Sequence, residues 1–191
     1  MKKLTFAFVL LAMASWCVTG CQSKGQKAQG EDSTLMVGDT VADSTVYGVC
    51  GEGTAMHTVE LITDAGDSVT YIIQEDEEGR SCVQGGLLVG DRLAVIGATD
   101  RDGERVATKV INLTTLQGKW TSLDKNFEIL EGGLIKSNVT AESNPWTEWK
   151  ILNGQLLLNR DTFDIDQLSA DSLYLENHDG IFVYKRVKQN A

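Results

Sequence analysis

The stretch from Leu113 to Asp124, which reads LTTLQGKWTSLD, divides the sequence into two halves that are both rich in β-strand signals. On either side of it, short runs with alternating apolar residues are separated by turn residues, a pattern typical of strands joined by tight turns. The chain has 191 residues with one proline and nineteen glycines, a composition that suits many short strands. The sequence therefore predicts an all-β protein with a hinge at this stretch.

The formal net charge of −10 excludes one class of function. A nucleic-acid-binding protein needs a basic face that displaces counterions from phosphates, and the sequence contains no cluster of lysine and arginine. The same deficit argues against electrostatic docking onto anionic lipid. We therefore expect no nucleic-acid partner.

The N-terminus carries the features of an export signal. A short basic start, Met1–Lys3, precedes the mostly apolar run Leu4–Trp16, which has signal-peptide length and is too short for a comfortable transmembrane span. The next residues, Val18-Thr19-Gly20-Cys21, resemble the lipobox of bacterial lipoproteins. An ordinary secretory signal with a chance cysteine is the alternative.

The lipobox resemblance implies that residues 1–20 are removed and that the Cys21 thiol carries a diacylglycerol. Acylation of the freed amine would add a further chain, and two or three chains anchor a protein stably where one is marginal. Residues 21–44 are mostly polar, as expected for the lipidated cysteine followed by a flexible tether. No acidic run that would resemble a surface-export signal follows Cys21. The expected location is the bacterial envelope, with the bilayer as partner through Cys21, on the outer membrane facing the periplasm.

Residues 45–113 form the expected first domain, a five-stranded barrel. The Glu75–Asp91 connection between its third and fourth strands is too long for a hairpin and shows no obvious helix. The run Gly90–Gly97, GDRLAVIG, resembles the fourth strand of small OB-fold barrels, which implies an OB-like β-barrel. Net charge favours a structural role over nucleic-acid binding. The predicted strands are Thr45–Gly51, Ala55–Thr63, Ser68–Gln74, Arg92–Thr99 and Glu104–Leu113.

Two groups of residues in this half are candidates for special chemistry. An oxidising envelope would permit a disulfide between Cys50 and Cys82, and two separate thiols are equally natural. The acidic run Glu75–Gly79 could hold calcium, but it lacks the spaced ligands of a dedicated loop and is better interpreted as a solvated loop. His57 is expected within a strand and has no second ligand at metal spacing. We therefore expect no metal and no cofactor.

Residues 118–187 form the expected second domain, an antiparallel up-and-down meander of eight strands. Asn153-Gly154 between two apolar runs is a strong hairpin signal. Closing such a meander into a barrel removes edge strands that would otherwise aggregate. The predicted strands are Lys119–Ser122, Phe127–Leu130, Leu134–Val139, Trp146–Leu152, Gln155–Asn159, Thr162–Leu168, Ser172–Glu176 and Ile181–Val187.

Three short motifs in this half carry a family resemblance. Gly118-Lys119-Trp120 opens it, Asn153–Leu156 lies in its middle and Tyr184-Lys185-Arg186 closes it. Together they look like the small lipocalin-like domains found in lipoproteins of gut anaerobes. Lipocalins bind small apolar molecules inside an eight-stranded barrel, so the resemblance implies a binding role without catalysis. Because strands of roughly five or six residues are short for this family, we expect a filled or shallow interior.

The resemblance also implies roles for individual residues. Trp120 of the first strand is expected to pack beneath the closed end of the barrel against Arg186 of the last strand. The candidate ligand-binding residues are Trp146, Trp149 and Tyr184. Alternation places Trp149 on one face of its strand and Trp146 on the other, where Trp146 contacts a ligand at the rim or, alternatively, is a plug or an outer-surface aromatic.

The leading hypothesis is a membrane-anchored envelope lipoprotein whose lipocalin-like domain binds a small apolar or glycan-derived ligand. The alternative is a non-catalytic structural or interaction module, with solid barrels that contact an envelope protein. The two histidines, His57 and His178, lie in different halves, so neither a Ser-His-Asp triad nor a metal-hydrolase site can be assembled. We therefore expect no enzymatic activity.

Replacement of Cys21 by serine tests the anchor. We expect Cys21→Ser to lose incorporation of labelled palmitate and to leave the membrane fraction, because the acyl chains have no thiol to join. Cys17→Ser, directly after the apolar run, is the matched control and should be lipidated normally. Palmitate incorporation by Cys21→Ser at the native level would contradict the lipobox assignment.

Overall fold

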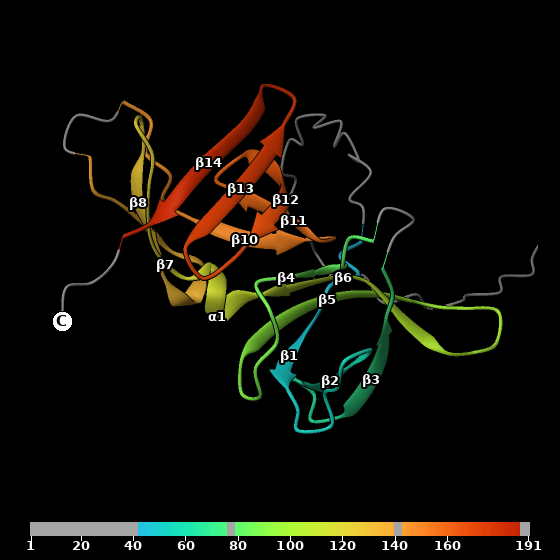
Figure 1. Ribbon diagram of the computed structural model, residues 1–191. Coiled ribbons are helices and arrows are strands. Elements are labelled where there is room, and N and C mark those ends of the chain that lie inside the picture. The colour runs from blue at the N-terminus through green and yellow to red at the C-terminus, as the bar shows by residue number, and fades with distance from the viewer. Residues whose placement is uncertain (1–41, 76–78, 140–142, 188–191) are drawn as a thin grey trace, which may run out of the picture. The chain divides into compact units, whose positions relative to one another are not determined.

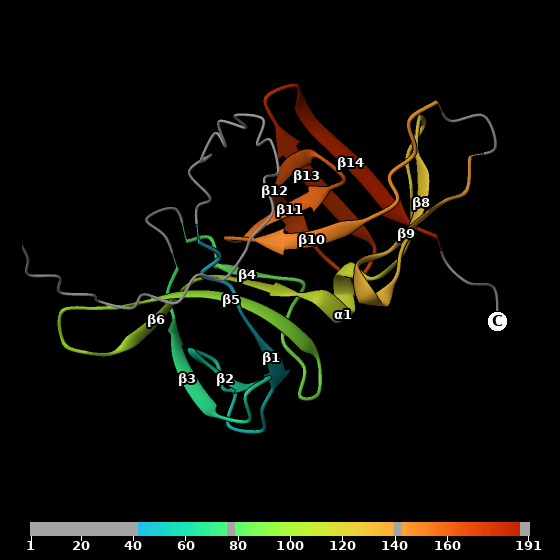
Figure 2. The same cartoon turned by 180° about the vertical axis from the view of Figure 1, so that it is seen from behind.

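The computed structural model describes residues 42–75, 79–139 and 143–187. The expected signal peptide, Cys21 and nearly all of the tether lie outside these residues, as does most of the acidic run Glu75–Gly79. Within the described residues, no helix combines the length and apolar character needed to cross a bilayer. The described chain forms two β-barrels, one after the other in sequence (Figures 1 and 2).

The first barrel is closed and has five main strands. The order around it is β1-β2-β3-β6-β5 and back to β1, with β3 and β6 parallel and the other pairs antiparallel. A two-residue strand, β4 (Val83–Gln84), lies parallel to β6. This is the strand order of an OB-fold, so the predicted OB-like barrel is confirmed. The main strands are β1 (Val46–Cys50), β2 (Thr58–Thr63), β3 (Ser68–Ile73), β5 (Arg92–Thr99) and β6 (Arg105–Asn112).

Alternating apolar residues of these strands fill the first barrel. Val59 and Leu61 of β2 and Leu93 and Val95 of β5 are fully buried. The residues that come directly before and after them in each strand are mostly more exposed. This is the period of two that a half-buried strand requires. The remaining members of the core are Cys50, Tyr71, Ala107 and Val110.

The predicted strand Ala55–Thr63 begins later than expected. Ala55 and Thr58 pair with each other across a tight turn, so β2 starts only at Thr58. His57 therefore lies exposed in that turn rather than within a strand, and its backbone carbonyl accepts from the Ile73 amide at 2.8 Å.

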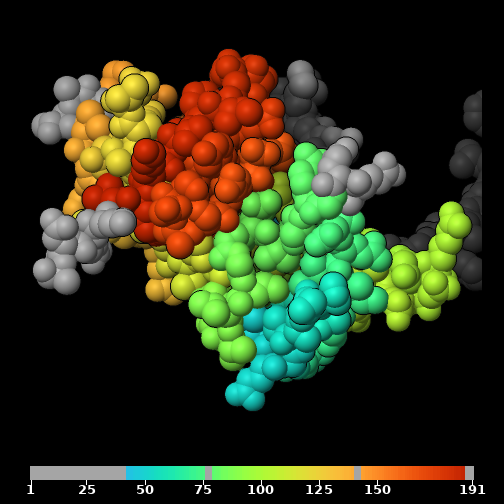
Figure 3. All heavy atoms as spheres, in the orientation of Figure 1, coloured from blue at the N-terminus to red at the C-terminus, as the bar shows by residue number. Residues whose placement is uncertain are grey.

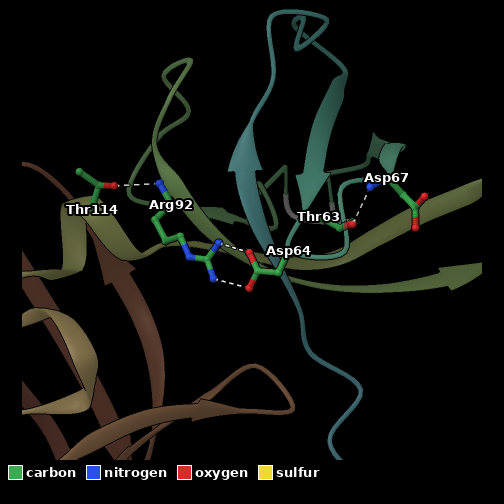
Figure 4. A network of polar contacts seen from close by, with 5 residues as sticks. All are labelled: Thr63, Asp64, Asp67, Arg92 and Thr114. Atoms are coloured by element: carbon green, nitrogen blue, oxygen red, sulfur yellow. Dashed lines mark hydrogen bonds and ion pairs between the residues drawn. The ribbon is translucent and has the colours of Figure 1, made fainter.

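Arg92 connects the β2–β3 turn with the hinge (Figure 4). Its guanidinium forms a bidentate ion pair with Asp64, and its backbone amide donates to Thr114 Oγ1 at 2.9 Å. The hydrogen bonds from Arg92 hold the pKa of the Asp64 carboxyl below its usual value. Because both side chains are more than a third exposed, solvent screens the pair, and such pairs contribute about 0–1 kcal/mol.

The second barrel is an antiparallel meander of eight strands that is nearly closed. The strands pair in sequence order from β7 to β9 and from β10 to β14, and β14 returns to pair with β7. Between β9 and β10 the connection is a single bridge, Leu134–Glu148, with one further hydrogen bond from Ile135 N to Thr147 O at 2.9 Å. The strands are β7 (Gly118–Thr121), β8 (Asn126–Ile129), β9 (Ile135–Ser137), β10 (Trp149–Leu152), β11 (Gln155–Leu158), β12 (Asp161–Leu168), β13 (Ser172–Asn177) and β14 (Gly180–Arg186).

The hinge contains a short helix, α1 (Leu113–Leu116), that the sequence pattern did not predict. Four residues are too few to show a helical period. Asn112 caps this helix, because its side-chain oxygen accepts from Thr115 N at 2.9 Å. Its amide nitrogen donates to Gly86 O at 3.0 Å and to Asp91 Oδ2 at 2.6 Å. Asn112 is 1 % exposed, and it is the one fully buried polar side chain in the described part of the chain. A second short helical turn, η1 (Glu131–Gly133), connects β8 and β9.

The two barrels belong to one compact unit and share a hydrophobic core. Ala94 and Ile111 of the first barrel belong to the same buried cluster as the interior of the second barrel. The Tyr47 hydroxyl also donates to Ile151 O at 2.8 Å, on the edge of β10 that does not face β11. Packing and hydrogen bonds therefore join the barrels in addition to the hinge.

Removal of the Asn112 side chain should destabilise the protein strongly. We expect Asn112→Ala to lower the free energy of unfolding by about 2–3 kcal/mol, because it removes the helix cap and leaves buried partners unsatisfied. Chemical denaturation measures the change. Asn138→Ala, at an exposed position, is the control and should change stability by less than about 0.5 kcal/mol. A loss below about 0.5 kcal/mol for Asn112→Ala would contradict this role.

Candidate ligand-binding site

The two ends of the second barrel differ. At one end, which we call the closed end, the chain enters at Gly118 and leaves after Arg186. At the other, the open end, the β7–β8, β9–β10, β11–β12 and β13–β14 connections come together, as the antiparallel order requires.

Arg186 seals the closed end. Its Cζ atom lies 4.1 Å from the centroid of the Trp120 ring, so the contact expected from the sequence is present in the structure. Nη1 donates to Gln117 O at 2.7 Å, Nε donates to Ala170 O at 2.5 Å, and Nη2 donates to Thr115 O. Burial lowers the pKa of Arg186, and these carbonyl acceptors compensate the half-buried guanidinium for lost water.

The Gly-x-Trp motif has a physical reason at this end. Gly118 has φ +126, and a Cβ atom there would collide with Arg186 Nη1. Only glycine combines that backbone conformation with room for the guanidinium. Trp120 is fully buried, and its indole N–H donates to Leu116 O at 2.8 Å.

Side chains fill the middle of the barrel, in agreement with the expected filled or shallow interior. Most of the residues that point inward from the strands are buried. Trp149 is one of these residues, and its indole N–H donates to Leu130 O at 2.8 Å. The other buried residues of the interior include Phe127, Ile129, Ile151, Leu156, Leu158, Phe163, Ile165, Leu168, Leu173, Leu175 and Tyr184.

A cleft of about 1090 Å³ lies at the open end. An aromatic cluster forms its floor, with rings packed edge to face. The ring centroids are 5.8 Å apart for Trp146 and Phe163, 5.9 Å for Phe163 and Phe182, and 6.5 Å for Trp146 and Tyr184. Phe127 supports this floor from below, 5.2 Å from Trp146 and 5.1 Å from Tyr184. The cleft is therefore apolar at its base.

The rim of the cleft is polar and carries both signs of charge. Lys125 Nζ lies 4.4 Å from the centroid of the Trp146 ring, and the indole N–H of Trp146 donates to Asp161 Oδ2 at 3.2 Å. His178 and Asp179, in the β13–β14 turn, are 3.2 Å apart and largely exposed. The rim residues hold the Trp146 ring in place and give the cleft a polar boundary.

The structure places the three candidate ligand-binding residues in two environments. Trp146 and Tyr184 line the cleft, whereas Trp149 lies in the filled interior away from it. The expectation that Trp146 and Trp149 face opposite sides is wrong. β10 begins only at Trp149, so strand alternation does not extend back to Trp146, and both indoles are buried. Phe163 and Phe182 also line the cleft and were missed as site residues.

In the first barrel, as elsewhere among the described residues, no group of three or more His, Cys, Asp or Glu side chains is placed to hold a metal ion. Cys50 and Cys82 are separate free thiols, so the structure shows no bridge between them. Cys50 Sγ lies 3.3 Å from Thr54 Oγ1, and partial burial raises the pKa of the Cys82 thiol. Both residues pack in the core of this barrel, which satisfies them without a bridge.

In comparisons with known proteins, no family model, curated protein or solved structure matches this chain. Function is therefore inferred from the geometry of the cleft and of the strands around it.

The closing contact can be measured by a double-mutant cycle. We expect Arg186→Ala to lower the free energy of unfolding by about 2–4 kcal/mol, because it removes charged hydrogen bonds and the cover over Trp120. In combination with Trp120→Leu, the two effects should deviate from additivity by more than about 0.5 kcal/mol.

A matched cycle pairs Trp120→Leu with Arg160→Ala, an arginine at the open end of the same barrel. These two changes should add within about 0.5 kcal/mol. Equal additivity in both cycles would show that Arg186 does not act through the indole.

Proposed function

We propose that the protein is a membrane-anchored envelope lipoprotein whose lipocalin-like second barrel binds a small apolar ligand. One observation carries this proposal: an apolar cleft at the open end of a barrel whose interior is otherwise filled. Ligand pockets in proteins usually measure about 300–1,000 Å³ and combine apolar walls with a few polar groups. The cleft of about 1090 Å³, with an aromatic floor and a polar rim, fits that description.

The mouth of the cleft supports binding rather than mere packing. Four large apolar residues, Leu123, Ile181, Phe182 and Val183, remain exposed there, and Leu123 is completely accessible. Exposure of adjacent apolar side chains costs free energy in water, and a group of them commonly marks a binding surface. A ligand with an apolar face would cover these side chains and rest on the aromatic floor.

The membrane anchor is proposed from the sequence alone. Acylated Cys21 and the polar residues that follow it would hold the two barrels near the outer membrane on its periplasmic side. The filled core of the first barrel suits a structural role. The second candidate function is a non-catalytic interaction module that contacts an envelope protein, and a strand edge beside the cleft that has no partner among the described residues favours it.

Titration with N-phenyl-1-naphthylamine, an apolar fluorescent probe, tests the small-ligand proposal. We expect one probe to bind per chain and to change the tryptophan fluorescence, because Trp146 forms part of the floor. Phe182→Ala should weaken binding about tenfold. Full burial of a phenylalanine side chain contributes roughly 1.5–3 kcal/mol, and the probe would bury only part of the Phe182 side chain.

Met56→Ala is the matched control for that titration. Met56 is an exposed apolar residue of the first barrel, 86 % accessible, so its loss should leave the affinity within twofold of native. Equal affinities for Phe182→Ala, Met56→Ala and native protein would contradict binding in the cleft.

A further inference from the structure

The β14 strand has a partner along only part of one edge. On its β13 side it is paired from Gly180 to Lys185. On its β7 side the ladder includes Lys185 and Arg186, and β7 ends at Thr121. Within residues 42–75, 79–139 and 143–187, no other strand pairs with β14 on that side. In Figures 1 and 2, β14 continues past the point where the β7–β8 hairpin diverges from it.

The register shows which backbone groups this edge presents. The amide of Val187 donates to Lys119 O at 2.9 Å, and the amide of Arg186 donates to Asp171 O at 2.8 Å. Odd-numbered residues of β14 therefore direct their N–H and C=O groups toward the β7 side, and even-numbered residues direct theirs toward β13. No described strand pairs with the N–H and C=O groups of Ile181 and Val183 on this side, so a further strand can pair with them.

In the described part of the chain, this edge lacks the usual protection of edge strands. Proteins blunt an exposed edge with lysine, proline, a bulge or a covering segment. The run Gly180–Tyr184 reads GIFVY and contains neither a charge nor a proline. By contrast, Tyr47 caps the outer edge of β10 at Ile151 O. In Figure 3 the red atoms of β14 form part of the visible surface, beside the yellow atoms of the β7–β8 hairpin.

The unpaired edge and the cleft occupy the same place. Ile181, Phe182, Val183 and Tyr184 all line the cleft. Alternation directs the side chains of Phe182 and Tyr184 inward, where they pack on the aromatic floor, and directs Ile181 and Val183 outward. A strand added here would therefore place alternate side chains into the cleft and over the exposed pair Ile181 and Val183.

We propose that the edge of β14 from Gly180 to Tyr184 binds an extended peptide as an added antiparallel strand, with one apolar side chain of the peptide in the cleft. The proposal rests on the proposed function in that it uses the same cleft, and it names the ligand class as peptide. The added strand continues the existing β7–β14 ladder in the same direction. Five residues of strand give it about 16 Å of pairing length.

Charges at the two ends of the edge determine which charged residues the preferred peptide carries at its own ends. Lys185 lies where the β7 ladder stops, and Asp179 lies in the turn before Gly180. A peptide antiparallel to β14 begins near Lys185 and ends near Asp179. An acidic residue at its start and a basic residue at its end complement these two charges.

The test uses the fluorescein-labelled peptide Glu-Val-Phe-Val-Ser-Lys with blocked termini, measured by fluorescence anisotropy. In the proposed register the phenylalanine lies opposite Phe182 and the valines lie opposite Val183 and Ile181. The valine amides face β14 and the phenylalanine amide faces away. We expect N-methylation of the first valine to weaken binding at least about tenfold, and N-methylation of the phenylalanine to change it less than about threefold.

A variant of the protein provides an independent measurement. Val183→Pro removes an N–H that faces the unpaired edge and leaves the β13 ladder complete, so the barrel should fold. We expect it to lose peptide binding at least about tenfold. Its far-UV circular dichroism spectrum and its midpoint of thermal unfolding should stay close to native, which shows that the barrel is folded.

The outcomes separate the edge from the cleft. If the native protein binds the probe but not the peptide, or binds both N-methylated peptides equally, the edge proposal is overturned and the small-ligand proposal stands. If it binds the peptide with the expected pattern but not the probe, the small-ligand proposal is the one that fails. Concentration-dependent dimerisation of the native protein in sedimentation velocity, abolished by Val183→Pro, would assign the edge to a second copy of the chain and overturn the peptide proposal.

Discussion

The contact between the Arg186 guanidinium and the Trp120 ring determines where the second barrel closes. It pairs the last strand with the first, and three backbone carbonyls fix the guanidinium in place. The guanidinium can approach the backbone at residue 118 only because that residue is glycine. Because the pairing with β7 is confined to one end of β14, the opposite end of the same strand pairs with β13 alone among the described residues. Closure at one end and an open cleft at the other are therefore consequences of a single register.

The cleft and the unpaired edge depend on the same mismatch in strand length. β7 has four residues and β14 has seven, so the ladder between them ends before the open end is reached. The interior beneath is filled by aromatic and aliphatic side chains, so what remains is a shallow site with a rigid floor. Binding at such a site would use the strand edge and the exposed apolar residues more than a deep cavity.

Much of this fold could be predicted from the sequence because nearly every strand has one buried face. The period of two identified β5 with its observed bounds, Arg92–Thr99, and located the other main strands to within a few residues. It failed where the backbone leaves the strand: at His57 in a turn and at Trp146 in a connection. The helix α1 is too short to show a period. Phe163 and Phe182 come from β12 and β14, which flank β13, so their contact across one strand depends on a strand order and register that the sequence does not show. The unequal lengths of the first and last strands were visible in the sequence, but their register was not.

Amide hydrogen exchange along β14, resolved by residue with NMR, tests the central claim most directly. Partial closure predicts slow exchange for Lys185 and Val187, whose amides face β7, and for Phe182 and Tyr184, whose amides face β13. The amides of Ile181 and Val183 should exchange much faster, by a factor of about 100 or more. Uniform protection from residue 181 to residue 187 would show that the edge is covered, and fast exchange at Lys185 and Val187 would show that the barrel does not close at Trp120 and Arg186.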